Sequence, residues 1–318
     1  MINRYRDDAR NVGTGVPIEV LPGIYEVRES LGPGFDVPDC WLSLYLLVDP
    51  THHAPPVLID SGWPRTAATV VVPALASLGY GPEALMAVIN THNHGDHTHG
   101  NGRLRAATGC EVWISDADAD GLDREAEFDG EVIPPDRPDR RLFAGEELDL
   151  AGRIWEVVPM PGHSPGSIGL WDRDSRVLIC GDALQAQATA VQGIAIIPDR
   201  DAYAATLDRV AALGAAHLLP AHPYAPFTTC HVDGEDEVAR YLDACHAHVA
   251  AYPGEVGAAL RALGGSATTA ALADRLCRDR GYAGTCPLAP RLLDSDRPHL
   301  ETRGIVRPGD PAGQWHLA

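Results

Sequence analysis

Residues 91–100, THNHGDHTHG, constrain this chain more than any other segment of its length. They place His92, His94, Asp96 and His97 in an H-x-H-x-D-H spacing directly after the apolar run AVIN. In a tight loop at the end of a strand, that spacing brings four side chains into one small volume. Neutral imidazoles and a carboxylate are ligands that borderline divalent ions favour. The segment therefore predicts a metal-binding loop that follows a strand and leads toward a helix.

Three further candidate ligands follow other strand-like runs. His163 lies in PGHSPGS after WEVV, Asp182 in CGDAL after RVLIC, and His222 in LLPAHP after HLL. Functional residues collect where the strands of layered α/β folds end. Each of the three on its own is more typical of a core, surface or turn residue, but the cluster at 91–100 favours ligation for all of them. Because Asp96 and His97 are adjacent, they can serve one metal while His92 and His94 serve another.

The first 233 residues alternate short strand-like and helical patterns. Strand-like runs cover residues 18–28 (two strands around a Pro-Gly turn), 41–48, 57–60, 87–90, 111–115, 153–158, 168–172, 176–180 and 217–219, and helical spacing covers 66–78, 100–108 and 202–213. The segments 29–40, 123–141 and 184–198 are expected to be loops at the rim of a pocket. Residues 123–141 are acidic, Pro-rich and aperiodic, which is typical of an exposed loop.

The pattern changes at about residue 234. Helical spacing covers residues 237–251, 255–263, 268–280 and 290–301, and a turn and the short strand QWHLA close the chain. Short helices followed by a strand pair are typical of a winged-helix unit. Residues 234–318 hold 9 Arg and 11 acidic residues, whereas the rest of the chain holds 16 Arg and 33 acidic residues. The sequence predicts a catalytic domain over 1–233 and a mostly helical, winged-helix-like domain over 234–318.

The motifs HNHGDH, GHS, GDA and AHP, in that order between strands, resemble the metallo-β-lactamase superfamily over roughly residues 17–232. The resemblance implies an α/β fold, the αββα sandwich, with a dinuclear site on one edge. It implies that His92, His94 and His163 hold one metal, that Asp96, His97 and His222 hold the other, and that Asp182 bridges both. It also implies two divalent ions, with Zn²⁺ favoured over Mn²⁺ or Fe. The helical tail is similar to the winged-helix-like domain of the lactamase-beta-like branch.

The expected activity is a metal-dependent hydrolysis. A hydroxide held by two metals would attack the carbonyl of a thioester, ester or lactone of a small acyl substrate. Asp96 and Asp182 are the candidates to pass a proton to the leaving group. Asp182 stands where many β-lactamases of this superfamily have Cys, so an antibiotic lactamase is disfavoured.

Three alternatives of other kinds stay open. One is a phosphodiesterase or endoribonuclease that acts on single-stranded nucleic acid. Another is a mononuclear iron dioxygenase that acts on persulfides, and the third is a non-catalytic binding module. The acidic catalytic domain disfavours the nuclease, and the full ligand set disfavours the binding module.

Composition narrows the function further. The chain carries 25 basic and 44 acidic residues, a net charge of −19, and none of the basic residues is Lys. The absence of Lys excludes Schiff-base catalysis and the Walker-A motif. The acidic balance argues against DNA binding.

The sequence also predicts where the protein is located. It has no apolar run long enough to span a membrane and no secretory signal, and its seven Cys form no C-x-x-C motif, so we expect a cytoplasmic protein with reduced thiols. The tail is expected to pack on the main domain, where it borders the active-site mouth, or on a second subunit in a homodimer.

A few further residues lie near the predicted strand ends. Trp41, Trp63, Tyr224 and Phe227 are each expected in the core rather than in a pocket wall. His99 is expected to be an exposed loop residue. Ser164 and Ser167 are expected to cap the turn after His163, because a metal-activated water makes a serine nucleophile unnecessary.

Overall fold

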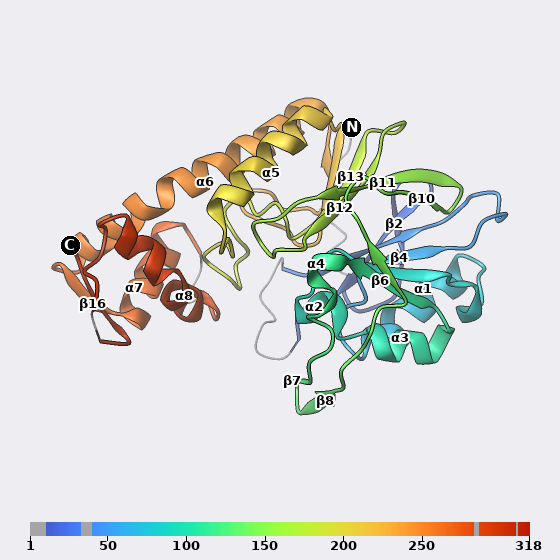
Figure 1. The fold of residues 1–318 in the computed structure, drawn as a ribbon, viewed down its shortest axis with the longest axis horizontal. Helices are drawn as coiled ribbons and strands as arrows, with labels where there is room; N and C mark the ends of the chain where they lie inside the picture. The colour runs from blue at the N-terminus through green and yellow to red at the C-terminus, as the bar shows by residue number, and fades with distance from the viewer. Residues whose placement is uncertain (1–10, 33–39, 283–285, 310) are drawn as a thin grey trace.

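Two β-sheets pack face to face in the computed structural model, which describes residues 11–32, 40–282, 286–309 and 311–318 (Figure 1). In this described part of the chain, the seven strands of the first sheet follow the order β1 (Ile18–Leu21), β2 (Ile24–Glu29), β3 (Leu42–Leu47), β4 (Val57–Ile59), β5 (Ala87–Asn90), β6 (Glu111–Ser115) and β9 (Arg140–Leu142). The six described strands of the second sheet follow the order β10 (Glu147–Leu150), β11 (Arg153–Pro159), β12 (Ile168–Asp172), β13 (Val177–Gly181), β14 (His217–Pro220) and β15 (Val232–Asp233). All strands predicted before residue 220 are present.

Apolar side chains from both sheets meet in the space between them. Tyr45 and Ile89 of the first sheet and Trp155 and Ile179 of the second are each at most 1% exposed. The central strands are covered on both faces, which explains why they read as continuous apolar runs such as VLIC in β13.

Helices cover the outer face of each sheet. The segments η2 (Ala67–Val71), α1 (Val72–Ser77) and α3 (Asn101–Thr108) pack on the first sheet, with the short turn η3 (Pro82–Ala84) before β5. The helices α5 (Arg200–Leu213) and the first half of α6 (Glu235–Ala262) pack on the second. Two one-turn helices, α2 (Gly95–Thr98) and α4 (Asp116–Ala119), lie close together at one edge of the sandwich (Figure 1). The predicted αββα layering is confirmed.

The segment 123–141, which we predicted to be a loop, contains a β-hairpin. Its strands β7 (Ala126–Phe128) and β8 (Glu131–Ile133) pair antiparallel and project from the sandwich (Figure 1). Asp129 and Gly130 between them both have positive φ, 51° and 74°. An Asp-Gly pair is the favoured two-residue hairpin turn. The prediction was therefore wrong for these residues, and the Asp129–Gly130 dipeptide was the signal that should have corrected it.

Helix α6 runs unbroken where two helices were predicted. Pro253 lies inside it, although proline removes one backbone hydrogen bond and costs roughly 3 kcal/mol within a helix. Apolar residues on both sides of Pro253 are buried, Tyr241 and Cys245 against α5, and Val256 and Leu260 among the C-terminal helices. Packing along the whole helix offsets the local cost of Pro253. The periodicity of the sequence does not reveal this packing, because the partners lie on other elements.

The predicted C-terminal helical region is present. The helices α7 (Thr269–Asp279) and α8 (Ala289–Thr302) and the strand pair β16 (Ser266–Thr268) and β17 (Gln314–His316) enclose a core that includes Leu276, Leu293 and Trp315. The boundary at residue 234 and the winged-helix-like character stay predictions. Within the described residues, no helix combines the length and apolarity that a bilayer span requires.

Candidate metal centre

The loop after β5 carries the first four candidate ligands. His92 and His94 lie between β5 and α2, and Asp96 and His97 lie in the first turn of α2. The backbone carbonyl of His97 accepts hydrogen bonds from the Asn90 side chain at 2.8 Å and from the Ser61 N–H at 2.9 Å. These bonds tie α2 to the ends of β4 and β5, so the spacing seen in the sequence becomes a convergent set.

The other three candidates reach the same edge from the second sheet. His163 lies between β11 and β12, while Asp182 and His222 follow the parallel strands β13 and β14. Gly181, directly before Asp182, has φ +52°, and a Cβ there would collide with Thr91. A glycine at this left-handed position lets the end of β13 approach the loop after β5. All seven predicted residues are therefore brought together.

The donor atoms form two sets joined by Asp182. His92, His94 and His163 offer nitrogens that lie within 4.8 Å of one another, and so do the ligand atoms of Asp96, His97 and His222. Asp182 Oδ2 lies 3.7 Å from His163 Nε2, whereas Oδ1 lies 3.6 Å from His97 Nε2 and 3.5 Å from His222 Nε2. Each carboxylate oxygen of Asp182 thus faces one set.

Hydrogen bonds orient four of the imidazoles from behind. The Nδ1 atom of His97 lies 2.8 Å from Asp60 Oδ2, and the Nδ1 atoms of His163 and His222 each lie 2.8 Å from a backbone carbonyl, those of Ile196 and Trp41. His92 Nδ1 lies 3.1 Å from the Thr91 hydroxyl. A proton on Nδ1 leaves Nε2 directed into the centre, which is how metal-binding histidines are commonly held.

The pKa shifts follow from burial and from the charges packed together. Burial, reinforced by His97 and His94, holds the pKa of His92 well below its usual range, and burial lowers the pKa of His163 to about 4. Burial opposes charge on His97 as well, but Asp96, Asp60 and Asp182 raise its pKa well above the usual value. His92 and His163 are therefore neutral imidazoles, whereas His97 holds a proton among carboxylates, and a metal cation would replace that proton.

The arrangement fits divalent cations. His97 Nε2 and Asp182 Oδ1 are buried, and neither makes a hydrogen bond. Two donors that share one tetrahedral ion lie about 3.3 Å apart. His92 Nε2 and His163 Nε2 lie 3.1 Å apart, and His222 Nε2 and Asp96 Oδ2 lie 3.3 Å apart. The described residues thus form His and Asp clusters suited to divalent metal binding.

Sequence reasoning missed two carboxylates that support the centre. Asp60 accepts from the Thr91 N–H at 2.7 Å as well as from His97, and it ends the predicted strand 57–60, so its place at a strand end was an available signal. Asp118 of α4 accepts from the Asn93 N–H, the Gly166 N–H and the Ser164 hydroxyl. It thereby joins the loops that carry His94 and His163, and no sequence signal pointed to it.

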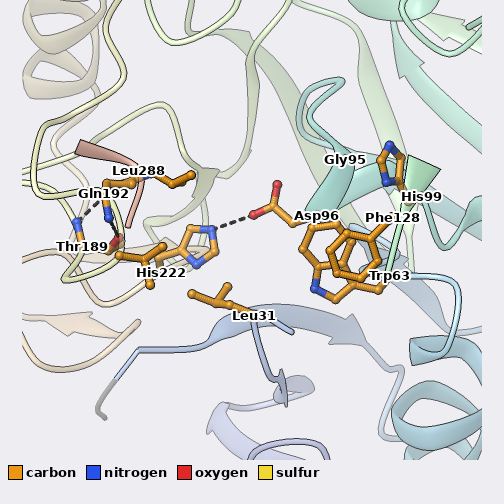
Figure 2. A pocket seen from close by; sticks show the side chains of 11 residues that line it. Leu31, Trp63, Gly95, Asp96, His99, Phe128, Thr189, Gln192, His222 and Leu288 are labelled. Carbon is orange, nitrogen blue, oxygen red and sulfur yellow. Dashed lines mark hydrogen bonds and ion pairs between the residues drawn. The ribbon is translucent and has the colours of Figure 1, made fainter. Parts of the chain in front are cut away.

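A cavity of about 270 Å³ opens beside Asp96 and His222 (Figure 2). Its lining consists of Leu31, Trp63, Gly95, Asp96, His99, Phe128, Thr189, Val191, Gln192, His222 and Leu288. Each of the three predicted rim segments contributes at least one of these residues. Residues 33–39 of the first segment lie outside the described part of the chain.

Two expectations about this cavity were wrong. Trp63 lines it instead of lying in the core, and its ring lies 5.9 Å from that of His99. His99 is half-buried rather than exposed. Packing between the hairpin and the loop after β5 creates this surface, so local sequence could not reveal it.

The expectations for Trp41, Tyr224, Phe227 and Ser167 are confirmed. Trp41 and Tyr224 are buried, and the Phe227 ring packs 4.6 Å from that of Tyr241. The Ser167 hydroxyl accepts from the Ser164 N–H, which caps the turn after His163.

A family profile, two curated relatives and a solved structure each match this chain. The sequence profile described as "Metallo-beta-lactamase superfamily" matches residues 39–222, more than half of the chain. A hydroxyacylglutathione hydrolase of Methylococcus capsulatus is 38% identical over 131 residues, which is 40% of this chain and 46% of that protein. The acyl-coenzyme A thioesterase MBLAC2 of Gallus gallus is 35% identical over 127 residues, 33% of this chain and 44% of that protein.

The chain spans less than half the length of these two curated relatives. A solved structure covers far more of it. The metallo-beta-lactamase family protein TTHA1429 from Thermus thermophilus superposes with a TM-score of 0.69 at 24% identity, over 94% of this chain and 99% of that protein. The fold is thus shared over nearly the whole length, and the profile match covers the segments that hold all seven clustered residues. The chain belongs to the metallo-beta-lactamase superfamily.

Proposed function

We propose that this protein is a metal-dependent hydrolase of a thioester, with an ester or a lactone as the next candidates. The observation that carries the proposal is the placement of Asp182, whose two oxygens face separate sets of ligand atoms. His92, His94 and His163 would hold one ion, Asp96, His97 and His222 would hold the other, and Asp182 would be shared. The names of the relatives, a glutathione-thioester hydrolase and an acyl-coenzyme A thioesterase, favour a thioester.

Divalent ions bound there would supply a Lewis acid for the acyl carbonyl and would lower the pKa of a bound water toward about 7. Residues of the chain itself would transfer the proton to the leaving group. Asp96 lies at the cavity wall with its side chain 25% exposed, whereas Asp182 is 4% exposed. Asp96 is therefore the carboxylate placed to hold and pass a proton to a leaving group in the cavity. A thiolate needs little protonation to leave, so a thioester makes the smallest demand on Asp96.

The test compares substrates with and without metal. Purified protein is assayed on thioesters, lactones and bis(p-nitrophenyl) phosphate before and after chelation, and bound metals are quantified by mass spectrometry. We expect thioester hydrolysis that chelation abolishes and zinc restores, at close to two ions per chain. Preferred cleavage of the phosphodiester would contradict the proposal and favour the nuclease alternative. A single iron with oxygen consumption on persulfides would favour the dioxygenase.

Zinc as the metal, a homodimer and a cytoplasmic location stay predictions from the sequence.

A further inference from the structure

We propose that the cavity beside the metal centre binds an apolar acyl group whose thioester carries no charge close to sulfur, and that it discriminates against glutathione thioesters. This inference rests on the proposed function. It names the substrate class of the same site from the side chains that line it.

The wall of the cavity is mainly apolar. Leu31, Trp63, Phe128 and Leu288 surround the space next to Asp96 and His222 (Figure 2). Val191 also lines the cavity. Trp63 and Phe128 stack with ring centroids 3.7 Å apart and planes within 5°. Rigid aromatic and aliphatic side chains hold apolar groups, and a few polar atoms orient the reacting end. In this cavity the metal centre supplies the polar atoms. The reacting carbonyl of a substrate would lie there, and its apolar substituents would contact the apolar wall.

Parts of the chain far apart in sequence build this wall. Phe128 comes from the β7–β8 hairpin and packs against Gly32, whose φ is +96° and where a Cβ would lie 2.8 Å from the Phe128 ring. Leu288 precedes α8, and its N–H donates to the Val191 carbonyl at 3.1 Å. The C-terminal region therefore completes the apolar side of the cavity.

The described lining contains no Arg or Lys side chain. The sequence segments that supply most of the lining, 29–64, 184–199 and 281–290, also contain none. Arg65 directly follows the first of these segments, but its guanidinium lies 3.4 Å from Glu29 and donates to the Ser30 carbonyl and hydroxyl. Its charge is therefore already matched by Glu29.

Among the residues that the structure describes, those of the neighbouring groove do not supply an unpaired cation either. Beyond His99, the hairpin and α3 line a second cavity that contains Arg103, Glu131 and Asp136. Arg103 pairs with Glu131 at 2.5 Å, and Asp136 pairs with Arg105 at 2.8 Å. Glutathione carries a carboxylate at each end of the tripeptide, and a site that binds it needs positive partners for them. In a chain of net charge −19, those carboxylates would be repelled.

The size of the cavity limits the acyl group. Its volume of about 270 Å³ is slightly below the common range of small-molecule sites, about 300–1,000 Å³. A medium-length alkanoyl or a single aromatic acyl group fits this description, and the rest of a larger thioester would extend into solvent.

The experiment varies the acyl group on one thiol and the thiol on one acyl group. Octanoyl and acetyl thioesters of N-acetylcysteamine are compared with octanoyl glutathione on zinc-loaded protein. We expect kcat/KM for octanoyl N-acetylcysteamine to exceed both of the other values at least tenfold. Phe128→Ala should lower the octanoyl value about tenfold and change the acetyl value less than twofold. Phe143→Ala is the matched control, because Phe143 is 58% exposed and does not line the cavity. A faster glutathione thioester, or equal effects of Phe128→Ala on octanoyl and acetyl substrates, overturns the proposal.

A binding measurement separates this inference from the proposed function. The non-hydrolysable thioethers S-octyl-N-acetylcysteamine and S-octylglutathione are titrated into zinc-loaded protein by calorimetry. If no thioester is hydrolysed and the N-acetylcysteamine thioether still binds at least tenfold more tightly, the proposed function fails and the cavity assignment stands. Equal or tighter binding of S-octylglutathione overturns the cavity assignment whatever the catalytic result.

Discussion

At the scale of single residues, the buried carboxylate of Asp60 orients several groups of the metal centre at once. It sits at φ +64°, an uncommon conformation that Asp and Asn tolerate better than other non-glycine residues. Its oxygens accept from His97 Nδ1 and from both the N–H and the hydroxyl of Thr91. It therefore fixes the His97 ring and the loop that carries His92, without lying in the centre itself.

Asp60→Asn should weaken metal binding while the fold stays intact. Asn keeps the side-chain size and tolerates the backbone conformation, but it removes the negative charge behind His97. Loss of such a partner typically costs 10- to 100-fold in metal affinity, and we expect that range for the ion held by His97. Competition with a chromophoric chelator measures it, and Asp243→Asn, an exposed change on α6, serves as the control. Unchanged affinity in Asp60→Asn would show that Asp60 has only a structural role.

Asp96→Ala and Asp182→Ala should each abolish hydrolysis and leave the circular dichroism spectrum unchanged. Both changes remove a proposed ligand and very little apolar packing. Steady-state kinetics on the best thioester tests this. If either variant keeps more than about a tenth of the wild-type kcat, a loss of less than ~1.4 kcal/mol in barrier, the assignment of that residue is wrong.

At the scale of elements, α6 links the two parts of the molecule. Its first half packs on the second sheet and its second half belongs to the C-terminal core. His248 lies where these halves meet and is 7% exposed. Burial lowers the pKa of His248 to about 3, and Arg280 beyond α7 and Arg200 of α5 contribute to the shift.

That shift predicts a loss of stability in acid. The unfolded chain binds a proton at His248 below a pKa of about 6.5, whereas the folded chain does so only near 3, so stability falls as pH decreases through this window. At pH 5 the loss from this residue is about 2 kcal/mol. His248→Leu should therefore show a smaller decrease in Tm between pH 7 and pH 5 than wild type. His246→Leu, an exposed change on the same helix, should keep the wild-type decrease, and an equal decrease in both variants would refute the role of His248.

At the scale of the whole molecule, charge determines which partners are excluded. The net charge of −19 and the near-neutral C-terminal region give the chain no electrostatic reason to bind a phosphate backbone. A gel-shift titration at physiological salt should show no sub-micromolar binding of duplex DNA or single-stranded RNA. Sub-micromolar binding that weakens with added salt would instead support the nuclease alternative.

The sequence alone determined the main features of the fold and of the centre. Continuous apolar runs such as residues 177–180 predict strands buried on both faces, because such strands have no solvent side. The H-x-H-x-D-H spacing predicts convergent ligands, because residues so close in a tight loop cannot point far apart. These are short-range effects, so a few neighbouring residues are enough to predict them.

Only the tertiary structure decided how distant segments complete the site. The two-sided placement of Asp182, the support of His97 by Asp60, and the wall built by Phe128 and Leu288 all depend on contacts between residues far apart in the chain. Such contacts arise when the two sheets stack and α6 carries the C-terminal region back to the cavity. The same long-range packing keeps α6 continuous through Pro253. The local periodicity of the sequence does not reveal this long-range packing, because the stabilising partners lie on other elements.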